Sequence, residues 1–186
     1  MRCFVAIDID KKTQAAIAEL QNDLQSKIKL RNVSIKWVRP EQMHLTLKFL
    51  GETEEGKIDT ICAAAEKAVA DCEKFDINIS TLGCFGKPVK VVWAGMENEN
   101  ELLNKLQTGV EDEMEKAGWA KEKRGFNAHL TLGRVKGDPG KVIKDVIYKY
   151  GPIAIPAIKT EAICVYKSDL TPQAAIYTNL KRMELK

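Results

Sequence analysis

HLTLKFLG, at residues 44–51, is the stretch that decides the fold, because its first four letters return in HLTLGRVK at residues 129–136. In each copy apolar residues alternate with polar ones, which is the two-residue period of a half-buried β-strand. Each copy therefore predicts a strand that buries its leucines on one face and shows its histidine and threonine together on the other.

The two copies contain both histidines of the chain, His44 and His129. Thr46 and Thr131 follow two positions later, so each strand would present an imidazole and a hydroxyl side by side. A single histidine on a strand is usually a structural or surface residue. The recurrence of one four-residue context around the only two histidines favours a shared function instead, with the two faces opposed across a site.

The length of 186 residues, 45% of them hydrophobic, is enough for one domain or for two small lobes that share a core. No linker or low-complexity stretch divides the chain, and we expect residues 1–186 to form a single two-lobed domain. The opening MRCFVAIDID is too short an apolar run and too acidic for a signal sequence or a membrane span. We therefore expect a cytoplasmic protein that does not associate with membranes.

Cysteine usage and net charge exclude two further classes. The five cysteines show no CxxC pair and no spacing with histidine that suits zinc, which predicts reduced thiols and no metal site. The net charge of +3 is mild. The chain therefore lacks the dense basic surface of a protein that grips long nucleic acids through their phosphates, but it would admit a short anionic ligand.

Periodicity and turn residues predict helices mixed with strands, in two sets that each contain one HLTL strand and that we expect to form two pseudo-symmetric lobes around a cleft. Asp10, Thr53 and Asp138-Pro139 are expected to begin three of the helices, and Gly118 to end another. Strands are expected at about residues 2–9, 33–38, 44–51, 75–79, 89–94, 129–136, 153–158, 161–166 and 174–185, helices at about 11–28, 53–73, 99–117 and 138–150, and a turn at 168–172.

The residues around the two histidines narrow the chemistry. Two histidines with no cysteine or carboxylate in either motif make a poor metal centre, since zinc takes three or four protein ligands. The chain has no GxSxG elbow, Walker loop or GxGxxG fingerprint. A paired acid and base remain, because one neutral imidazole can take a proton from a nucleophile while a protonated one gives a proton to a leaving oxygen. This pairing suits phosphodiester cleavage, with the threonine hydroxyls donating to nonbridging phosphate oxygens.

Paired HxT motifs on a chain of this length resemble the two-histidine phosphoesterases, and specifically the RNA 2′,3′-cyclic phosphodiesterases historically named 2′-5′ RNA ligases. The resemblance covers essentially the whole chain, because RCFVAIDI, HLTLKFLGE, FGKPVKVVWAG, FNAHLTLGRVK and SDLTPQAAIY follow in the family's order. It implies an α+β bilobal pseudo-symmetric fold, in which two antiparallel sheets line a central cleft and the helices lie outside.

The resemblance also implies a reaction, the opening of a terminal 2′,3′-cyclic phosphate of RNA to a 2′-phosphomonoester without metal or other cofactor. In the family's scheme His129 would activate water, His44 would protonate the departing O3′, and Thr46 and Thr131 would hold the phosphate oxygens. The motifs themselves are symmetric and leave the acid and base assignment open. The reverse reaction, ATP-independent joining of a 5′-hydroxyl end in a 2′-5′ linkage, would be a weak side activity. The expected partners are RNAs with cyclic phosphate ends, tRNA fragments among them, and the expected state is a monomer.

Three further residues are candidates for substrate binding. Arg134 stands five positions after the second motif histidine, where some relatives carry a phosphate-contacting arginine, but strict alternation puts it on the opposite face unless a bulge at Gly133 turns it back. Lys48 lies four positions after His44, so strict alternation puts it on the same face of the strand. We expect it to contact nucleotides beside the phosphate. Phe126 would either stack on a base or pack in the core.

The remaining basic and aromatic residues near the motifs are expected to have plainer roles. Lys121, Lys123 and Arg124 form a basic loop that would either guide RNA toward the cleft or be solvated. Trp37 and Trp93 are expected to pack in the core.

Two other interpretations remain open. The same chemistry would serve a small cyclic nucleotide or an ADP-ribose cyclic phosphate, as in other branches of the two-histidine family. Alternatively, the fold would be a non-catalytic module that binds nucleotides or RNA ends. The intact histidine and threonine pairs speak against that module, because binding alone needs no acid–base pair.

Overall fold

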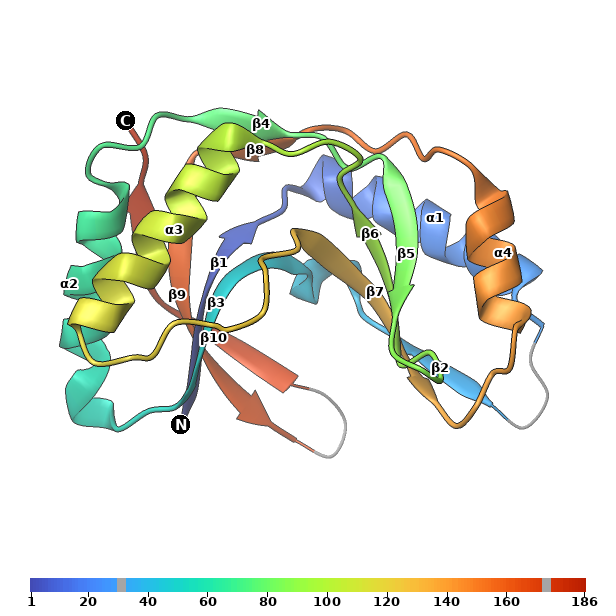
Figure 1. Cartoon of the computed structure of the whole chain (residues 1–186), viewed down its shortest axis with the longest axis horizontal. Helices are drawn as coiled ribbons and strands as arrows, with labels where there is room; N and C mark the ends of the chain where they lie inside the picture. The colour runs from blue at the N-terminus through green and yellow to red at the C-terminus, as the bar shows by residue number, and fades with distance from the viewer. Residues whose placement is uncertain (30–32, 172–174) are drawn as a thin grey trace.

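Two four-stranded antiparallel sheets frame the computed structural model, which describes residues 1–29, 33–171 and 175–186 (Figure 1). The first sheet runs from edge to edge through β10 (Ala175–Glu184), β9 (Ala162–Leu170), β1 (Arg2–Asp8) and β3 (His44–Glu52). The second runs through β2 (Ser34–Trp37), β7 (His129–Lys136), β6 (Val91–Gly95) and β5 (Thr81–Phe85). The short strands β4 (Phe75–Ile77) and β8 (Ile158–Thr160) pair with each other.

Two helices accompany each sheet and lie on its outer side (Figure 1). The first lobe consists of the first sheet with α2 (Ile58–Val69) and α3 (Glu101–Lys116), and the second lobe of the second sheet with α1 (Lys11–Lys27) and α4 (Val142–Tyr150). Two 3₁₀ turns, Pro40–Gln42 and Glu55–Lys57, precede β3 and α2. The expected α+β class, with helices outside two antiparallel sheets, is confirmed. No described helix is long and apolar enough to cross a membrane.

The two lobes, each with one HLTL strand as expected, are interleaved along the chain. The first sheet combines β1 and β3 with the C-terminal strands β9 and β10, and the second takes β2 from between β1 and β3. The repeated motif predicted the two lobes but not this interleaving, because strand pairing is decided by contacts between distant segments, which a local repeat does not encode.

Local signals placed some helix ends correctly and others not. The Asp10 carboxylate accepts a hydrogen bond from the Thr13 N–H at 2.7 Å and begins α1 as predicted. Gly118 follows α3 with φ of 103°, a conformation that glycine adopts without a Cβ clash. Thr53 does not cap α2, because its hydroxyl bonds to the Gly51 carbonyl and a 3₁₀ turn intervenes. Asp138 accepts from an N–H within its own turn, and α4 begins only at Val142.

Some predicted strand and turn boundaries were wrong in segments that contain both turn-forming and strand-forming residues. Residues 81–85 form β5, where the sequence predicted no strand. The strand expected at 153–158 is confined to β8, at Ile158–Thr160. The turn expected at 168–172 begins later, because β9 continues to Leu170, and its end at residue 172 lies outside the described residues.

A bulge interrupts the first HLTL strand. In the pairing of β1 with β3 the register shifts past Leu47 and again past Leu50, and each shift leaves one extra residue in β3. The alternation of faces therefore changes after Leu47, so Lys48 is buried and Phe49 is exposed. The expectation that Lys48 shares the functional face with His44 was wrong for this reason.

The second HLTL strand has the matching bulge. In the pairing of β6 with β7 the register shifts past Leu132, and Gly133 is buried while Arg134 is exposed. A Cβ on Gly133 would lie 2.6 Å from Cγ2 of Ile35 on β2, so glycine is the residue that fits there without a shift of its neighbours. The bulge that would return Arg134 to the functional face is present.

Lys48 forms an ion pair inside the first lobe. Its Nζ lies 2.5 Å from Oε2 of Glu111 on α3, and the two residues are only 4% and 7% exposed. A buried ion pair gains little net stability over apolar residues of similar volume, because both charges lose their water. Removing one partner leaves the other charge buried and unpaired, which is far more costly.

We therefore expect Lys48→Met alone to lower the free energy of unfolding by about 3–5 kcal/mol, and Lys48→Met with Glu111→Leu to recover most of that loss. Urea denaturation followed by circular dichroism measures both. A single variant as stable as the wild type would contradict the buried pair.

Candidate active site

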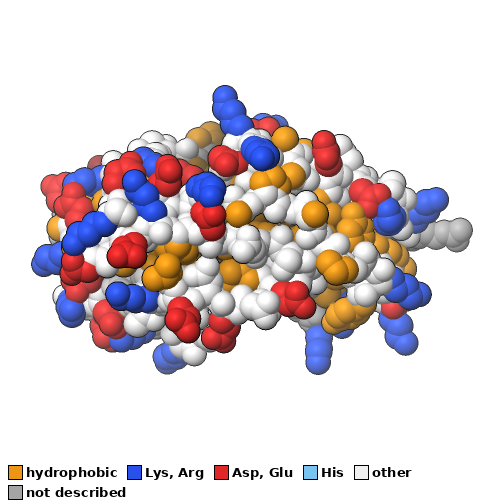
Figure 2. Space-filling view, turned by 90° about the horizontal axis from the view of Figure 1, so that it is seen from above, with side chains coloured by type: hydrophobic (Ala, Val, Ile, Leu, Met, Phe, Trp, Pro, Cys, Tyr) orange, Lys and Arg blue, Asp and Glu red, His pale blue; other side chains and the backbone are white. Residues whose placement is uncertain are grey.

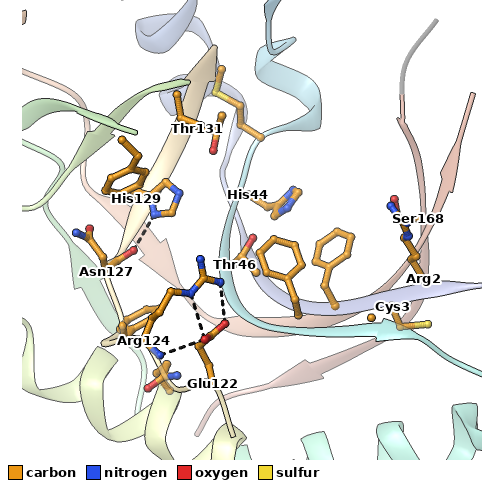
Figure 3. Close-up of a pocket in the computed structure, with 18 of the residues that line it drawn as sticks. Arg2, Cys3, His44, Thr46, Glu122, Arg124, Asn127, His129, Thr131 and Ser168 are labelled. Carbon is orange, nitrogen blue, oxygen red and sulfur yellow. Dashed lines mark hydrogen bonds and ion pairs between the residues drawn. The ribbon is translucent and has the colours of Figure 1, made fainter. Parts of the chain in front are cut away.

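A cleft of about 1090 Å³ separates the two sheets and takes lining residues from both lobes (Figure 3). His44 and Thr46 reach it from β3, and His129 and Thr131 reach it from β7. The leucines that alternate with them are buried. The two motifs, far apart in sequence, thus present their imidazoles and hydroxyls to one space, as their pattern predicted.

Each histidine is oriented by a backbone carbonyl two residues earlier. His44 Nδ1 lies 3.1 Å from the Gln42 carbonyl oxygen, and His129 Nδ1 lies 2.7 Å from the Asn127 carbonyl oxygen. A carbonyl oxygen only accepts, so Nδ1 carries the proton in both rings and donates it. Nε2 is then the nitrogen left for a ligand, as a proton acceptor in the neutral ring and a donor in the charged one.

His44 stands among aromatic rings. The Phe4 ring stacks on it with centroids 4.5 Å apart, and the Tyr177 ring meets it edge-on at 5.1 Å. This burial lowers the pKa of His44 to about 4, against the opposing effects of the Gln42 carbonyl and Asp8, while the Arg134 charge adds to the lowering. His44 is therefore neutral near pH 7 in the free protein.

Three hydrogen-bonded polar side chains, from β1 and β9, lie near His44 on the first sheet. Asp8 lies opposite His44 in the register of β1 and β3. The Tyr166 hydroxyl donates to Oδ1 of Asp8 at 2.6 Å, and the Cys164 thiol donates to Oδ2 at 3.4 Å. Burial raises the pKa of Tyr166, and it raises the pKa of Cys164 to about 11, so both remain protonated donors at neutral pH. Nothing in the sequence pattern indicated this group.

His129 has a different environment on the second sheet. The Phe85 ring meets it edge-on with centroids 5.0 Å apart, and the Trp93 ring lies 6.4 Å away. The Trp93 ring covers Gly83, where a Cβ would lie 2.1 Å from the indole. Trp93 was expected to pack in the core, but it is only partly buried, does not pack against the core cluster of the described residues and instead lies beside a motif histidine.

The other predicted binding residues divide into those at the cleft and those away from it. Arg134 lines the cleft, and its charge acts on the pKa values of both His44 and Tyr177 across the lobes. Phe126 lines the cleft and also packs against the core. Lys48 is absent from the lining and paired in the interior.

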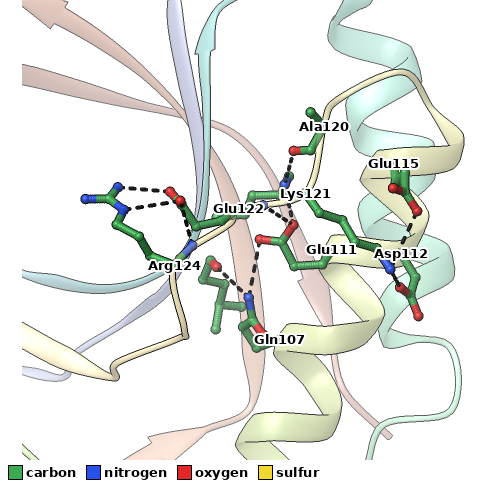
Figure 4. Close-up of polar contacts among 10 residues, drawn as sticks. Gln107, Glu111, Asp112, Glu115, Ala120, Lys121, Glu122 and Arg124 are labelled. Carbon is green, nitrogen blue, oxygen red and sulfur yellow. Dashed lines mark hydrogen bonds and ion pairs between the residues drawn. The ribbon is translucent and has the colours of Figure 1, made fainter.

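The basic loop is less positive than its sequence suggested. Lys121 pairs with Asp112 and also lies 3.5 Å from Glu115, and Arg124 pairs with Glu122 (Figures 3 and 4). The Arg124 guanidinium lowers the pKa of Glu122 to about 2, which keeps that carboxylate charged. Much of the positive charge of this loop is therefore already balanced.

The cleft residues that were not predicted from the sequence include two aromatic side chains on the first sheet. Phe49 is 70% exposed although it is a large apolar side chain, and Tyr177 on β10 packs against His44. Phe49 stands five positions after His44, just as Arg134 stands five positions after His129, so this spacing was readable from the sequence. Among the described residues, no group of three or more histidine, cysteine or carboxylate side chains is placed to hold a metal ion.

In the free protein, we expect the His44 ring to titrate at about pH 4. Inorganic phosphate should raise that pKa, because a nearby anion favours the charged imidazole. Phosphate would then bind with uptake of a proton, and its affinity would fall as the pH rises above about 4. NMR titration of labelled imidazoles, with His129→Ala for assignment, measures the shift. A value near 6.5 without phosphate would contradict the buried setting.

Comparisons with known proteins point to one family. Residues 7–93 and 95–177 match the family model described as LigT like Phosphoesterase. A protein of Methanothermobacter thermautotrophicus named RNA 2′,3′-cyclic phosphodiesterase is 32% identical over 188 residues, which cover 100% of this chain and 99% of the relative. One of Methanocaldococcus jannaschii with the same name is 34% identical and covers 97% of this chain and 99% of the relative.

Solved structures show the same fold. The crystal structure of E. coli LigT in apo form superposes with a TM-score of 0.80 at 23% identity and covers 99% of this chain and 96% of that one. TT0787 of Thermus thermophilus gives a TM-score of 0.73 at 27% identity, with 100% and 98% covered. With the family model matching most of its length, the chain belongs to the LigT-like phosphoesterase family.

Proposed function

We propose that this protein hydrolyses the terminal 2′,3′-cyclic phosphate of RNA to a 2′-phosphomonoester by acid–base catalysis with its two histidines and without metal. The observation that carries the proposal is the pair of imidazoles that leave Nε2 to one cleft, each fixed through Nδ1. The relatives in Methanothermobacter thermautotrophicus and Methanocaldococcus jannaschii, which match nearly the whole chain, bear the name of this activity.

In the proposed reaction water attacks phosphorus and gives its proton to Nε2 of His129. The bond between phosphorus and O3′ breaks, and O3′ takes the proton from Nε2 of His44, which leaves the phosphate on O2′. The hydroxyls of Thr46 and Thr131 and the guanidinium of Arg134 donate to the nonbridging oxygens. This assignment of acid and base follows the family resemblance.

The environment of His44 adds a condition to this scheme. A histidine with a pKa of about 4 carries almost no proton at neutral pH, so it cannot act as the acid before the substrate arrives. An anionic phosphate beside it would raise that pKa and supply the charged form. Substrate binding and protonation of the acid are thereby coupled.

Aromatic and apolar side chains along the cleft suit an RNA end. Phe49 and Phe126 lie on the walls beyond the motifs, and base stacking on aromatic rings contributes about 1–3 kcal/mol per base. E. coli LigT has been crystallised with 3′-AMP, which has a nucleobase beside its phosphate. We propose stacking on these rings as the source of affinity for the nucleotide.

The wider setting follows the same proposal. We propose that residues 1–186 act as one two-lobed catalytic domain, because each sheet combines strands from distant parts of the chain. We propose a cytoplasmic monomer that acts on RNA fragments, those of tRNA among them, and that can join a 5′-hydroxyl end in the reverse direction. Reversal needs only that an RNA hydroxyl replace water between the same two imidazoles.

The first test is hydrolysis of a short RNA that ends in a 2′,3′-cyclic phosphate, in excess EDTA. We expect a 2′-phosphate product, and a loss of about 10²- to 10⁴-fold in kcat for His44→Ala and for His129→Ala. Tyr148→Ala, on the exposed face of α4, is the control. Binding of the RNA without turnover by the wild type would favour a binding module, and turnover of free cyclic nucleotides in preference to RNA would favour the small substrate.

Arg134→Gln tests the phosphate contact. A charge-assisted hydrogen bond contributes about 1.5–3 kcal/mol, so kcat/KM should fall by roughly 10- to 150-fold. Lys136→Gln removes an exposed cation two residues farther along β7 and should leave kcat/KM unchanged. Equal effects of the two substitutions would show that Arg134 contributes only general positive charge.

A further inference from the structure

Residues 117–128 join α3 of the first lobe to β7 of the second (Figure 1). We call this segment the crossing loop. Its Asn127 carbonyl accepts the hydrogen bond that orients His129. The crossing loop contributes Lys121, Glu122, Arg124, Gly125, Phe126 and Asn127 to the cleft lining.

The middle of the crossing loop has little structure of its own. Outside helices and strands, no backbone-to-backbone hydrogen bond found among the described residues involves residues 120–126. These residues belong to no helix or strand either. Their path must therefore be set by side chains.

Two buried charged side chains form hydrogen bonds with the loop backbone on either side of Lys121 (Figure 4). Nζ of Lys48 donates to the Ala120 carbonyl at 2.8 Å, and the Glu122 N–H donates to Oε2 of Glu111 at 3.2 Å. The same Oε2 accepts from Lys48 at 2.5 Å. The remaining oxygen of Glu111 accepts from Gln107 at 3.3 Å, which holds the carboxylate in place.

The position of this pair follows from the bulge in β3. The extra residue turns Lys48 inward, toward α3, at the place where Phe49 turns out to the cleft. The corresponding residue of β7 is Gly133, which packs against Ile35 and carries no charge. The ion pair is therefore a feature of the first lobe alone, where the crossing loop departs.

We propose that Lys48 and Glu111 are positioning residues, which hold the crossing loop so that the Asn127 carbonyl keeps the His129 ring in its catalytic tautomer and orientation. Lys48 is absent from the cleft lining, and Glu111, which borders the cleft, is only 7% exposed and has both oxygens engaged by protein donors. A buried pair that contributed only to packing could be replaced by apolar residues without loss of function. A pair that directs the loop cannot, because apolar side chains offer no partner to the Ala120 carbonyl or the Glu122 N–H.

The test is the folded double variant Lys48→Met with Glu111→Leu, which leaves no unpaired buried charge. In the free protein, ¹⁵N NMR should show His129 moving from the Nδ1–H tautomer toward a mixture of the two. The kinetic part rests on the proposed function, and kcat/KM for the cyclic-phosphate RNA should fall by about 10- to 100-fold, mainly through kcat, since small misplacements cost up to that much. A folded double variant with wild-type kcat/KM and a wild-type His129 tautomer would overturn the proposal.

The matched control is the exposed pair Lys159 and Asp76, which joins β8 to β4 outside the cleft. Lys159→Met with Asp76→Asn should change neither the His129 tautomer nor kcat/KM. If the wild type does not hydrolyse the RNA, the proposed function fails, while the NMR comparison still decides the positioning role.

A second pair of variants covers the case in which the double variant does not fold. Glu122→Pro removes the N–H that Glu111 accepts and leaves the ion pair intact, whereas Glu122→Ala keeps that N–H. We expect Glu122→Pro to shift the His129 tautomer and to have a lower kcat/KM than Glu122→Ala. Identical behaviour of these two variants would overturn the proposal.

Discussion

The one-residue bulge in β3 and β7 is the constraint on which the contents of the cleft depend. A strand that alternates strictly shows every second residue, so the fifth position after each histidine would face the core. The extra residue, Leu47 or Leu132, changes the parity, and Phe49 and Arg134 come to the cleft instead. Each motif strand thus offers a histidine, a threonine and a third side chain, aromatic in the first lobe and cationic in the second.

The two motifs are symmetric in sequence but not in surroundings. His44 is enclosed by Phe4 and Tyr177, and this burial, together with the smaller effect of the Arg134 charge from the other lobe, lowers its pKa to about 4. His129 meets Phe85 at its edge and takes its orientation from a loop carbonyl. The two imidazoles are chemically identical, but their surroundings differ. We therefore expect a bound phosphate to have a large effect on the pKa of His44.

Because the chain is interleaved, each lobe contributes residues that act on the motif histidine of the other lobe. The crossing loop leaves α3 in the first lobe, passes the buried charges of Lys48 and Glu111, and ends at the histidine of the second lobe. Two charges with almost no contact with water are costly to keep, and they are used here to direct backbone groups that form no regular structure. Under the proposed positioning role, the first lobe fixes the orientation of the motif histidine of the second.

The repeated motif, with its histidines, threonines and buried leucines, was enough to predict two half-buried strands and the central residues of the cleft, whereas the α+β class and the two antiparallel sheets followed from the family resemblance. The two motif strands could be predicted because local alternation is visible in neighbouring letters. The interleaving of the lobes and the two missed helix starts could not be predicted, because strand pairing and intervening turns depend on distant contacts.

The sequence by itself determined which groups face a common site and what chemistry they suit, since side-chain type and two-residue periodicity are local properties. Only the tertiary structure decided that Lys48 lies inside and Phe49 outside, because the position of a bulge is set by the partner strand. It also decided that His44 and His129 differ in environment, because burial and charge come from residues far apart in the chain.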